Sequence, residues 1–422
     1  MRRKALGVAV ASTALFLTAC SGGSATSNAA PGKVKLVWWH NATADPLKSY
    51  FQQVADAYTK AHPDVTFDIQ PIQNETIDTK IQVALQSNTP PDLFQQWGGG
   101  ELAQQVQSGK VQDITAATSA MATGLGGSAA GWQVDGKQYG VPYSLGVVGF
   151  WYRTDLFQKA GITAPPTTMD ELNADVGKLK AAQITPIAVG GKDKWPDAFY
   201  FGQFAIRECT PDTLKSAAKS ISFADPCFLK AAQDVQTFVA TKPFQNGFLG
   251  TPAQQGATSS AGLVANGKAA MELQGHWNGA VINGLTADKA PLGDKLAWFP
   301  FPTTSGGAGS PDTTFGGGDG FSCSSKAPPA CADFLNFLLN TENQSAFGAS
   351  GAGLPVAPNT AASVTDATVK GVLAARDASK FTQLYFDKAL PTAVGSALND
   401  QVSNLFAGQG TPQDVVDAVK PS

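Results

Sequence analysis

Aromatic side chains and polar groups stand together where predicted strands end, and this pairing is the main chemical signal in the sequence. The candidate residues are His40, Asn41, Gln96, Trp97, Tyr143, Trp195, Trp277, Gly318 and Asp319. Flat aromatic faces stack on the apolar C–H face of a sugar ring, and amides and carboxylates hydrogen-bond its neighbouring hydroxyls. We therefore expect these residues to bind a sugar. Trp97, Trp195 and Trp277 are the expected stacking rings, because glycine or proline loops flank them.

The same residue types also have ordinary structural roles. Tryptophan is usually buried as part of a core. We expect this of the tryptophans within predicted strands or a hairpin, which are Trp38, Trp132, Trp151 and Trp298. His40 and His276 are better suited to hydrogen-bonding within loops than to acting as bases, and Asp319 fits a turn as well as a binding site.

Familiar catalytic motifs are missing from the sequence. It has no GxSxG motif of an α/β-hydrolase and no GxxxxGK[ST] phosphate loop. The run Gly316-Gly-Gly-Asp-Gly320 precedes a predicted strand instead of joining a strand to a helix, so it is a poor phosphate cradle. The sequence therefore predicts a binding protein without a cofactor, and not an enzyme. The alternative is an exported carbohydrate-active enzyme, because any two of the 33 acidic residues could form a glycosidase pair.

Alternating strands and helices must position the candidate residues. Strands are predicted near 34–39, 65–69 and 93–97, with helices between them near 47–58 and 77–85. This order predicts a parallel sheet with helices on its faces. Later strands are predicted near 185–189, 269–273, 296–301 and 320–323, and later helices near 199–207, 228–240, 329–340 and 342–348. Because one sheet cannot easily hold all of these elements, we expect two α/β lobes.

Residues 132–172 carry the densest local signals. Asp135-Gly136 favours a two-residue hairpin turn, since such turns need positive φ at both central positions. An apolar strand is predicted at 147–152, and the short helix after it is closed by Gly161. Thr168 and Glu171 have the spacing of a capping box at the start of the next helix.

The order of motifs in this segment resembles a known family. The motifs are DGKQYGVP from Asp135, WYRTDLF from Trp151, KAGI from Lys159, PPTT from Pro165 and DEL from Asp170. Together they resemble the family 1 extracellular solute-binding proteins of carbohydrate ABC transporters, the group that includes maltose-binding protein. The resemblance extends over nearly the whole mature chain. The segment GKAAMELQGHW before Asn278 is similar to the family segment in which a tryptophan, here Trp277, stacks on sugar.

This resemblance implies a two-lobe α/β fold of the periplasmic-binding-protein type, with discontinuous lobes, a hinge and a ligand cleft between the lobes. It implies an N-terminal lobe of residues 33–145 and 303–348 and a C-terminal lobe of residues 146–302 and 349–422. The chain is expected to cross between them near 143–149, 301–304 and 348–355.

The function that the resemblance implies is capture of a sugar or short oligosaccharide and its delivery to the permease subunits of an ABC importer. The expected ligand is a plant-polysaccharide product such as xylobiose or cellobiose, and the chain resembles xylobiose- or xylo-oligosaccharide-binding members of the family. A non-sugar solute is a further alternative. A monomer is expected, and the net charge of −3 argues against nucleic acid as a partner.

Residues 1–20 read as a targeting segment. Arg2, Arg3 and Lys4 precede an apolar run that is too short to span a bilayer, and the run ends in Leu17-Thr18-Ala19-Cys20, which looks like a bacterial lipobox. Cleavage there would leave a palmitoylated Cys20, followed by a flexible tether at 21–32. The expected location is the extracellular face of the bacterial cytoplasmic membrane, with a lipid anchor. An ordinary secretory signal is the alternative.

Four cysteines remain beyond Cys20, and an even number in an exported chain implies disulfides. The sequence allows three connectivities. We favour Cys209–Cys227 and Cys323–Cys331, because each pair is close in sequence. A metal site is a weak alternative, since there are three histidines and no CxxC motif.

Overall fold

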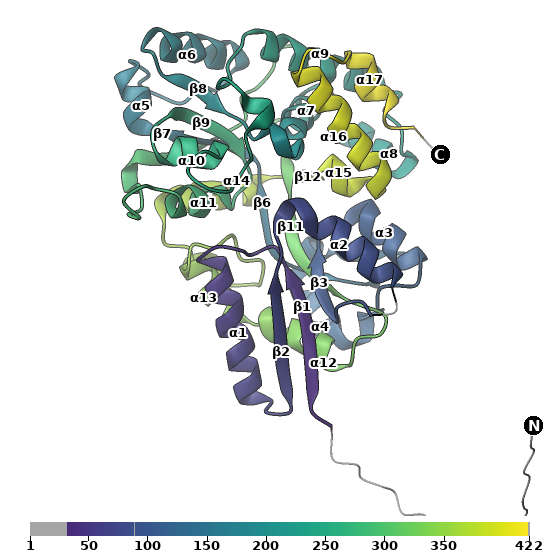
Figure 1. Ribbon diagram of the computed structural model, residues 1–422. Helices are drawn as coiled ribbons and strands as arrows, with labels where there is room; N and C mark the ends of the chain where they lie inside the picture. Colours follow the sequence, from purple (N-terminus) through teal and green to yellow (C-terminus); the bar gives the residue numbers. More distant parts are fainter. Residues whose placement is uncertain (1–31, 88, 421–422) are drawn as a thin grey trace, which may run out of the picture.

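The computed structural model describes residues 32–87 and 89–420, which form two α/β lobes stacked end to end (Figure 1). The expected two-lobe α/β fold is confirmed. The signal segment, Cys20 and most of the tether lie outside the described residues. Among the helices that the structure describes, none has both the length and the apolar character needed to cross a membrane.

The first lobe is built on a six-stranded sheet with the order β12-β11-β3-β1-β2 and with β6 paired to β11. Its strands are β1 (Val34–His40), β2 (Val65–Pro71), β3 (Leu93–Gln96), β6 (Val141–Val147), β11 (Thr313–Cys323) and β12 (Phe381–Leu384). β1 pairs in parallel with β2 and β3, whereas β11 runs antiparallel to β3 and β6. The strand–helix alternation predicted for residues 34–97 is therefore confirmed.

Helices cover this first sheet, and aromatic rings fill the space beneath them. The helices are α1 (Leu47–Ala61), α2 (Asn74–Gln86), α3 (Gly99–Gln107), α4 (Thr115–Leu125), α12 (Ala330–Leu338) and α13 (Thr341–Ala349). Trp38 lies at the centre of the core, with its ring centroid 4.9 Å from that of Phe51 and 5.2 Å from those of Phe321 and Phe334. Cys323–Cys331 joins the end of β11 to α12.

The second lobe is built on a four-stranded sheet with the order β10-β7-β9-β8. Its strands are β7 (Gly149–Arg153), β8 (Thr185–Ala188), β9 (Ala269–Gln274) and β10 (Leu296–Pro300). Helices surround this sheet (Figure 1): α5 (Thr154–Lys159), α6 (Met169–Ala181), α7 (Trp195–Glu208), α8 (Pro211–Ser220), α9 (Pro226–Ala240), α10 (Ser260–Ala265) and α11 (Asn278–Gly284). Cys209–Cys227 joins the end of α7 to α9. Both favoured disulfides are confirmed, and loops of this size contribute roughly 3 kcal/mol each.

The local signals of residues 132–172 fold as predicted. Asp135 and Gly136 have φ of 50° and 75° between β4 (Gln133–Val134) and β5 (Lys137–Gln138). Gly161 follows α5 with φ of 73°. The Thr168 hydroxyl accepts from the Glu171 backbone N–H, and the Glu171 carboxylate accepts from the Thr168 N–H, so the capping box is formed.

The chain passes between the two sheets several times. Val148 alone separates β6 in the first sheet from β7 in the second, and residues 301–312 lead back from β10 to β11. The segment after α13 runs beside β6, with Pro355 opposite Ser144, and continues into α14 (Ala367–Ala378).

Residues after 348, for which the sequence patterns predict no element, also form regular structure. After α14 come β12, α15 (Phe386–Ala389), α16 (Thr392–Phe406) and α17 (Pro412–Asp417). β12 pairs with β11 in the first sheet, whereas side chains of α16 and α17 belong to the second-lobe core. The C-terminal segment therefore contacts both lobes.

Two expectations from the sequence are wrong in detail. The glycine run at 316–320 lies inside β11 instead of before a strand. Glycine disfavours strands. Here, however, other segments of the chain approach so closely that a Cβ at Gly317 would lie 2.6 Å from the Tyr385 ring. Trp38, Trp132 and Trp151 are core residues as expected, whereas Trp298 lies on the edge strand β10 and is only partly buried.

Candidate functional site

Three aromatic rings lie next to one another where elements of the two lobes meet, and we call Trp195, Trp277 and Tyr385 the aromatic row. Trp195 begins α7, Trp277 follows β9 and Tyr385 follows β12. Ring centroids are 6.4 Å apart between Trp195 and Trp277 and 6.3 Å apart between Trp277 and Tyr385. Both tryptophans are partly exposed, whereas Tyr385 is 5% exposed and its hydroxyl is buried without a hydrogen-bond partner.

The loop that carries Trp277 is fixed from beneath by the second sheet. The Trp151 Nε1–H donates to the Gly275 carbonyl over 2.9 Å. The Asn278 amide donates to Glu272 Oε2 over 2.8 Å, and burial raises the pKa of Glu272 to about 8. A Cβ at Gly275 would lie 2.2 Å from the Trp277 ring, so only glycine lets the ring fold back over this turn. Glu272 therefore has a structural role in this loop.

Trp195 and Tyr385 are held through a shared neighbour on α7. The Phe199 ring lies 5.1 Å from the Trp195 ring edge-on and 5.1 Å from the Tyr385 ring in a stacked arrangement. Asp197 is fully buried in the same turn of α7, and burial raises its pKa to about 7. The aromatic row therefore rests on packed side chains rather than on a mobile loop.

Asp319 on β11 places a carboxylate beside the aromatic row. Its Oδ1 accepts the Trp97 Nε1–H over 2.9 Å and the Gln95 amide over 3.1 Å. Burial raises the pKa of Asp319 to about 6, although these two donors act in the opposite direction. The Tyr385 ring packs against β11 two residues before Asp319, where a Cβ at Gly317 would lie 2.6 Å from it. Burial, and next the negative charge of Asp319, raise the pKa of the Tyr385 phenol.

Trp97 does not present a free stacking face. It is 7% exposed and packs among the apolar side chains of α2 and α3. The Lys388 ammonium lies 4.2 Å from the centre of its ring, and Lys388 is itself paired with Asp78 and with Glu101 Oε2, the latter at 3.0 Å. Trp97 therefore acts here as a hydrogen-bond donor to Asp319.

Gln96 and Gly318 are also used by the fold. Gln96 Oε1 accepts the Trp97 and Gly98 backbone N–H groups over 2.8 and 2.9 Å, and its amide donates to Gln105. A Cβ at Gly318 would lie 2.3 Å from Leu145, so this glycine permits close strand packing. We therefore leave both residues out of the proposed site.

His40 and Tyr143 lie inside the first-lobe core. His40 is fully buried, its Nδ1 accepts the Ala42 N–H over 3.2 Å, and burial lowers its pKa to about 3. Tyr143 is 2% exposed and stacks on Phe321 with centroids 5.0 Å apart. Asn41 is partly buried at the end of β1 and donates to Asn74 Oδ1 over 3.1 Å. The structure does not bring these three residues to the aromatic row.

Of the predicted residues, the structure brings Trp195, Trp277 and Asp319 near one another. Tyr385 and Gln95 are added to this candidate site. Tyr385 has the signal that identified the others, an aromatic at a strand end with a carboxylate, Asp387, nearby. Its strand β12 is only four residues long and was not recognisable as a strand. Within the described residues, no group of three or more metal-ligating side chains is placed to hold an ion.

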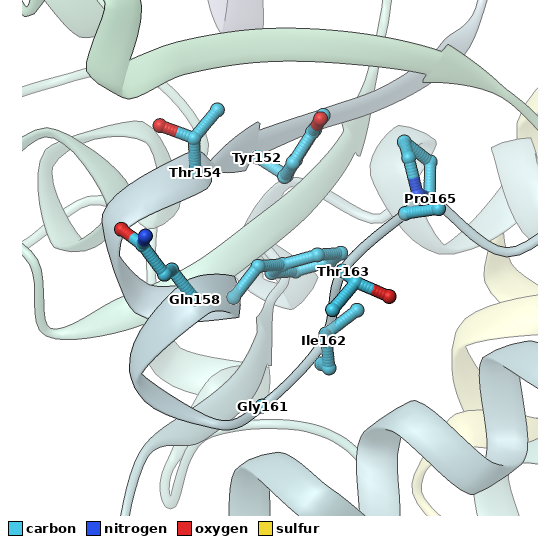
Figure 2. Close-up of a pocket in the computed structure, with 9 residues that line it drawn as sticks. Tyr152, Thr154, Gln158, Gly161, Ile162, Thr163 and Pro165 are labelled. Carbon is cyan, nitrogen blue, oxygen red and sulfur yellow. The ribbon is translucent and has the colours of Figure 1, made fainter.

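A separate pocket of about 360 Å³ lies at the corner of β7 and α5 (Figure 2). Its lining combines Tyr152 and Phe157 with the polar side chains of Thr154, Gln158 and Thr163. All of its lining residues come from 152–165, within the second lobe. It offers no carboxylate, so it is the poorer match to a ring of sugar hydroxyls.

Comparisons with known proteins point to one family. The family model described as bacterial extracellular solute-binding protein matches residues 42–345. An uncharacterized ABC transporter extracellular-binding protein of Pyrococcus horikoshii is 26% identical over 95% of this chain and 92% of its own length. The melibiose/raffinose/stachyose-binding protein of Bacillus subtilis is 26% identical over 49% of this chain and 48% of its own.

Solved structures share the fold over most of the chain. A structure from a study of xylan utilization by the thermophilic bacterium Caldanaerobius polysaccharolyticus has a TM-score of 0.82 and 26% identity, and covers 92% of this chain and 99% of that one. A chitin oligosaccharide binding protein has a TM-score of 0.80 and 24% identity, and covers 92% and 97%.

Proposed function

The chain belongs to the family of bacterial extracellular solute-binding proteins, and we propose that it is the sugar-binding component of an ABC importer. The sugar is held where the two lobes meet, and the lobes close on it by a hinge motion. The closed, loaded form is the one that the permease subunits recognise. The protein acts as a monomer in this role.

The observation that carries this proposal is the aromatic row beside a partly buried carboxylate. Trp195 and Trp277 supply apolar faces, the unpartnered Tyr385 hydroxyl can donate or accept a hydrogen bond, and Asp319 can accept from sugar hydroxyls. Asp319 Oδ1 already accepts two N–H groups, which leaves Oδ2 for a ligand. This combination suits a neutral polyhydroxy ligand with apolar ring faces.

The ligand that we propose is a short oligosaccharide of xylose. Rings spaced at 6.3 and 6.4 Å support a ligand longer than one sugar unit. The relationship to the protein from the study of xylan utilization, which is 26% identical over nearly its whole length, favours xylo-oligosaccharides as the first ligands to test.

Calorimetric titration and thermal melts test the function directly. A ligand that binds only the folded state raises the free energy of unfolding by RT ln(1 + [L]/Kd), and the melting temperature rises with it. We expect xylobiose or xylotriose to bind and to raise the melting temperature, while amino acids, peptides and divalent metals do not. If a non-sugar solute binds and no sugar does, the proposed sugar ligand is wrong and the non-sugar solute takes its place.

The relatives are solute-binding proteins, and we propose that this chain has no hydrolytic activity of its own. Glycoside hydrolysis usually needs two carboxyl groups about the scissile bond, and Asp319 is the carboxylate that we place beside the aromatic row. Xylotriose incubated with the protein should be recovered intact by chromatography. The release of xylose or xylobiose would instead support the alternative that this chain is an exported carbohydrate-active enzyme.

We also propose a lipid anchor on Cys20 and the lobe division 33–145 with 303–348 and 146–302 with 349–422, except that β12 (Phe381–Leu384) belongs to the first sheet. The lipobox Leu17-Thr18-Ala19-Cys20 supports the anchor, and the change of sheet at Val148 supports the first boundary. Mass spectrometry of protein from the native membrane should find an acylated Cys20. Quantitative release of an unmodified chain into the medium would reject the anchor.

A further inference from the structure

One serine hydroxyl joins three chain segments where the chain crosses between the lobes. Ser144 lies on β6, close to the point at which the chain leaves the first sheet. Its Oγ lies 2.9 Å from His276 Nε2 and 3.1 Å from the Leu354 carbonyl oxygen, and it accepts the Leu354 N–H over 3.2 Å. Leu354 belongs to the segment that returns from α13 toward the second-lobe core.

The hydrogen-bond donors and acceptors around Ser144 define which ring nitrogen of His276 carries a proton. A hydroxyl has one proton to donate and two lone pairs with which to accept. If Ser144 donates to the Leu354 carbonyl, then the His276 Nε2–H must donate to Ser144 Oγ. His276 is then a neutral donor, in agreement with its burial, which lowers its pKa to about 3.

The His276 ring is tightly packed against β6. A Cβ at Gly146 would lie 2.2 Å from the His276 ring, so the imidazole is pressed against the backbone of β6. The Arg376 guanidinium donates to the Leu145 carbonyl over 3.3 Å and to the Pro355 carbonyl over 2.8 Å, which ties the same two crossing segments together. Movement of these segments against the second lobe must therefore move the His276 ring.

His276 is also the direct neighbour of Trp277 in the chain. The two rings meet edge to face, with centroids 5.2 Å apart. Gly275 and Asn278, which flank His276 and Trp277, are hydrogen-bonded to Trp151 and Glu272 of the second lobe. His276 is instead hydrogen-bonded to Ser144 on β6 of the first sheet. The loop that carries Trp277 thus has one attachment that crosses to the other lobe.

We infer that His276 is a positioning residue that couples the angle between the lobes to the placement of the Trp277 ring. This inference rests on the proposed function, in which Trp277 stacks on the sugar. Opening of the lobes moves Ser144 relative to the second sheet, the imidazole follows it, and the adjoining indole changes its position. Because coupling between sites is reciprocal, a sugar stacked on Trp277 favours the lobe angle at which the Ser144–His276 hydrogen bond is formed.

The first test needs no ligand. The protein is labelled with 5-fluorotryptophan, and the fluorine NMR resonance of Trp277 is assigned by its loss in Trp277→Phe. Ser144→Ala and His276→Leu should shift or broaden this resonance, whereas His276→Gln, which keeps an N–H donor, should move it less. Ser324→Ala is the matched control, because Ser324 is a buried serine that follows β11. A Trp277 resonance unchanged in Ser144→Ala and His276→Leu would overturn the inference.

The second test is a double-mutant cycle with xylotriose. Ser144→Ala should weaken binding about three- to tenfold, the effect of losing a neutral hydrogen bond. In a Trp277→Ala background the same change should weaken binding less than about twofold, because the ring that it positions is gone. Independent effects of the two changes would overturn the coupling. If the parent protein does not bind xylotriose, the proposed ligand is what fails, and the fluorine NMR test alone decides the role of His276.

Discussion

Trp97 and Trp277 occupy equivalent places in the sequence but opposite kinds of environment in the structure. Each follows a strand and stands beside glycine and an amide or imidazole side chain. Trp97 is 7% exposed, donates its N–H to Asp319 and carries the Lys388 ammonium on its ring. Trp277 is partly exposed and meets the edges of the His276 and Tyr385 rings.

The difference shows that an aromatic residue at a strand end can serve a site in two ways. In the site that we propose, Trp97 acts through its indole N–H, which donates to the Asp319 carboxylate. Trp277 is proposed to act through the face of its own ring. Which role applies depends on whether neighbouring elements cover the ring, and the following predictions test this division.

The largest expected effect is on folding. Trp97→Ala should lower the free energy of unfolding by about 3–5 kcal/mol, because it leaves a cavity among the buried side chains of α2 and α3. Guanidinium denaturation followed by circular dichroism measures this change. A variant that unfolds at the parental midpoint, yet no longer binds sugar, would mean that Trp97 is a ligand ring after all.

Trp277→Ala should act on binding rather than on folding. Losing a stacking face should weaken sugar affinity about ten- to a hundredfold, while the midpoint of denaturation changes little because the ring is partly exposed. Calorimetric titration measures the affinity. Gln158→Ala, in the pocket of Figure 2, is the matched control and should bind as the parent does. A large loss of stability without loss of affinity would make Trp277 a core residue.

The burial of Asp319 predicts a pH dependence of sugar binding. The pKa of Asp319 is raised to about 6, so the carboxylate that we propose as an acceptor for sugar hydroxyls is protonated as the pH falls through this value. At pH 5 the sugar affinity should be about tenfold lower than its plateau above pH 7.

The raised pKa of Asp319 affects the free energy of unfolding in the opposite direction to the sugar affinity. The folded protein binds this proton more tightly than the unfolded chain, so Asp319 favours unfolding as pH rises toward 6 and stabilises the fold as pH falls. Affinity and stability should therefore respond in opposite directions between pH 4 and 6. Asp319→Asn removes the titrating group. An affinity profile in that variant that still falls below pH 6 would assign the dependence to another group.

The smallest effect is expected where the lobes touch at the surface. The Gln255 amide in the second lobe donates to Gln73 Oε1 and Glu75 Oε2 at the start of α2, both over 2.7 Å. Because these hydrogen bonds are exposed to water, Gln255→Ala should weaken sugar affinity by less than about threefold. A tenfold loss by titration would show that this contact, and not the aromatic row, dominates closure.

Much of the fold was accessible from the sequence because its signals are local. The hairpin at Asp135-Gly136 needs only two residues that accept positive φ, and the capping box of Thr168 and Glu171 needs only a spacing of three. The pairing of cysteines that are close in sequence followed the same logic, and both disulfides are formed. Such features depend on few neighbours, so tertiary packing seldom overrides them.

The site was accessible only in part. Trp195 and Trp277 are predicted from aromatic rings beside loops, and Asp319 from its place in the glycine run, although the structure puts Asp319 inside β11. Tyr385 was missed because the four residues of β12 give too little periodicity to reveal a strand. The glycine run that contains Gly318 is predicted to precede a strand but lies inside β11, where the close approach of Leu145 leaves no room for a Cβ.

The sequence by itself determined the alternation of strands and helices, the two lobes and the residue types that suit a sugar, because these follow from periodicity, capping and composition. Tertiary structure alone decided which rings remain exposed, since Tyr143 is buried against Phe51 of α1 and Phe347 of α13, which are distant in sequence, whereas Trp277 is partly exposed. It also decided that Ser144, His276 and Leu354 meet. A hydrogen bond between residues more than a hundred positions apart has no local pattern, because only the packing of the lobes brings its partners together.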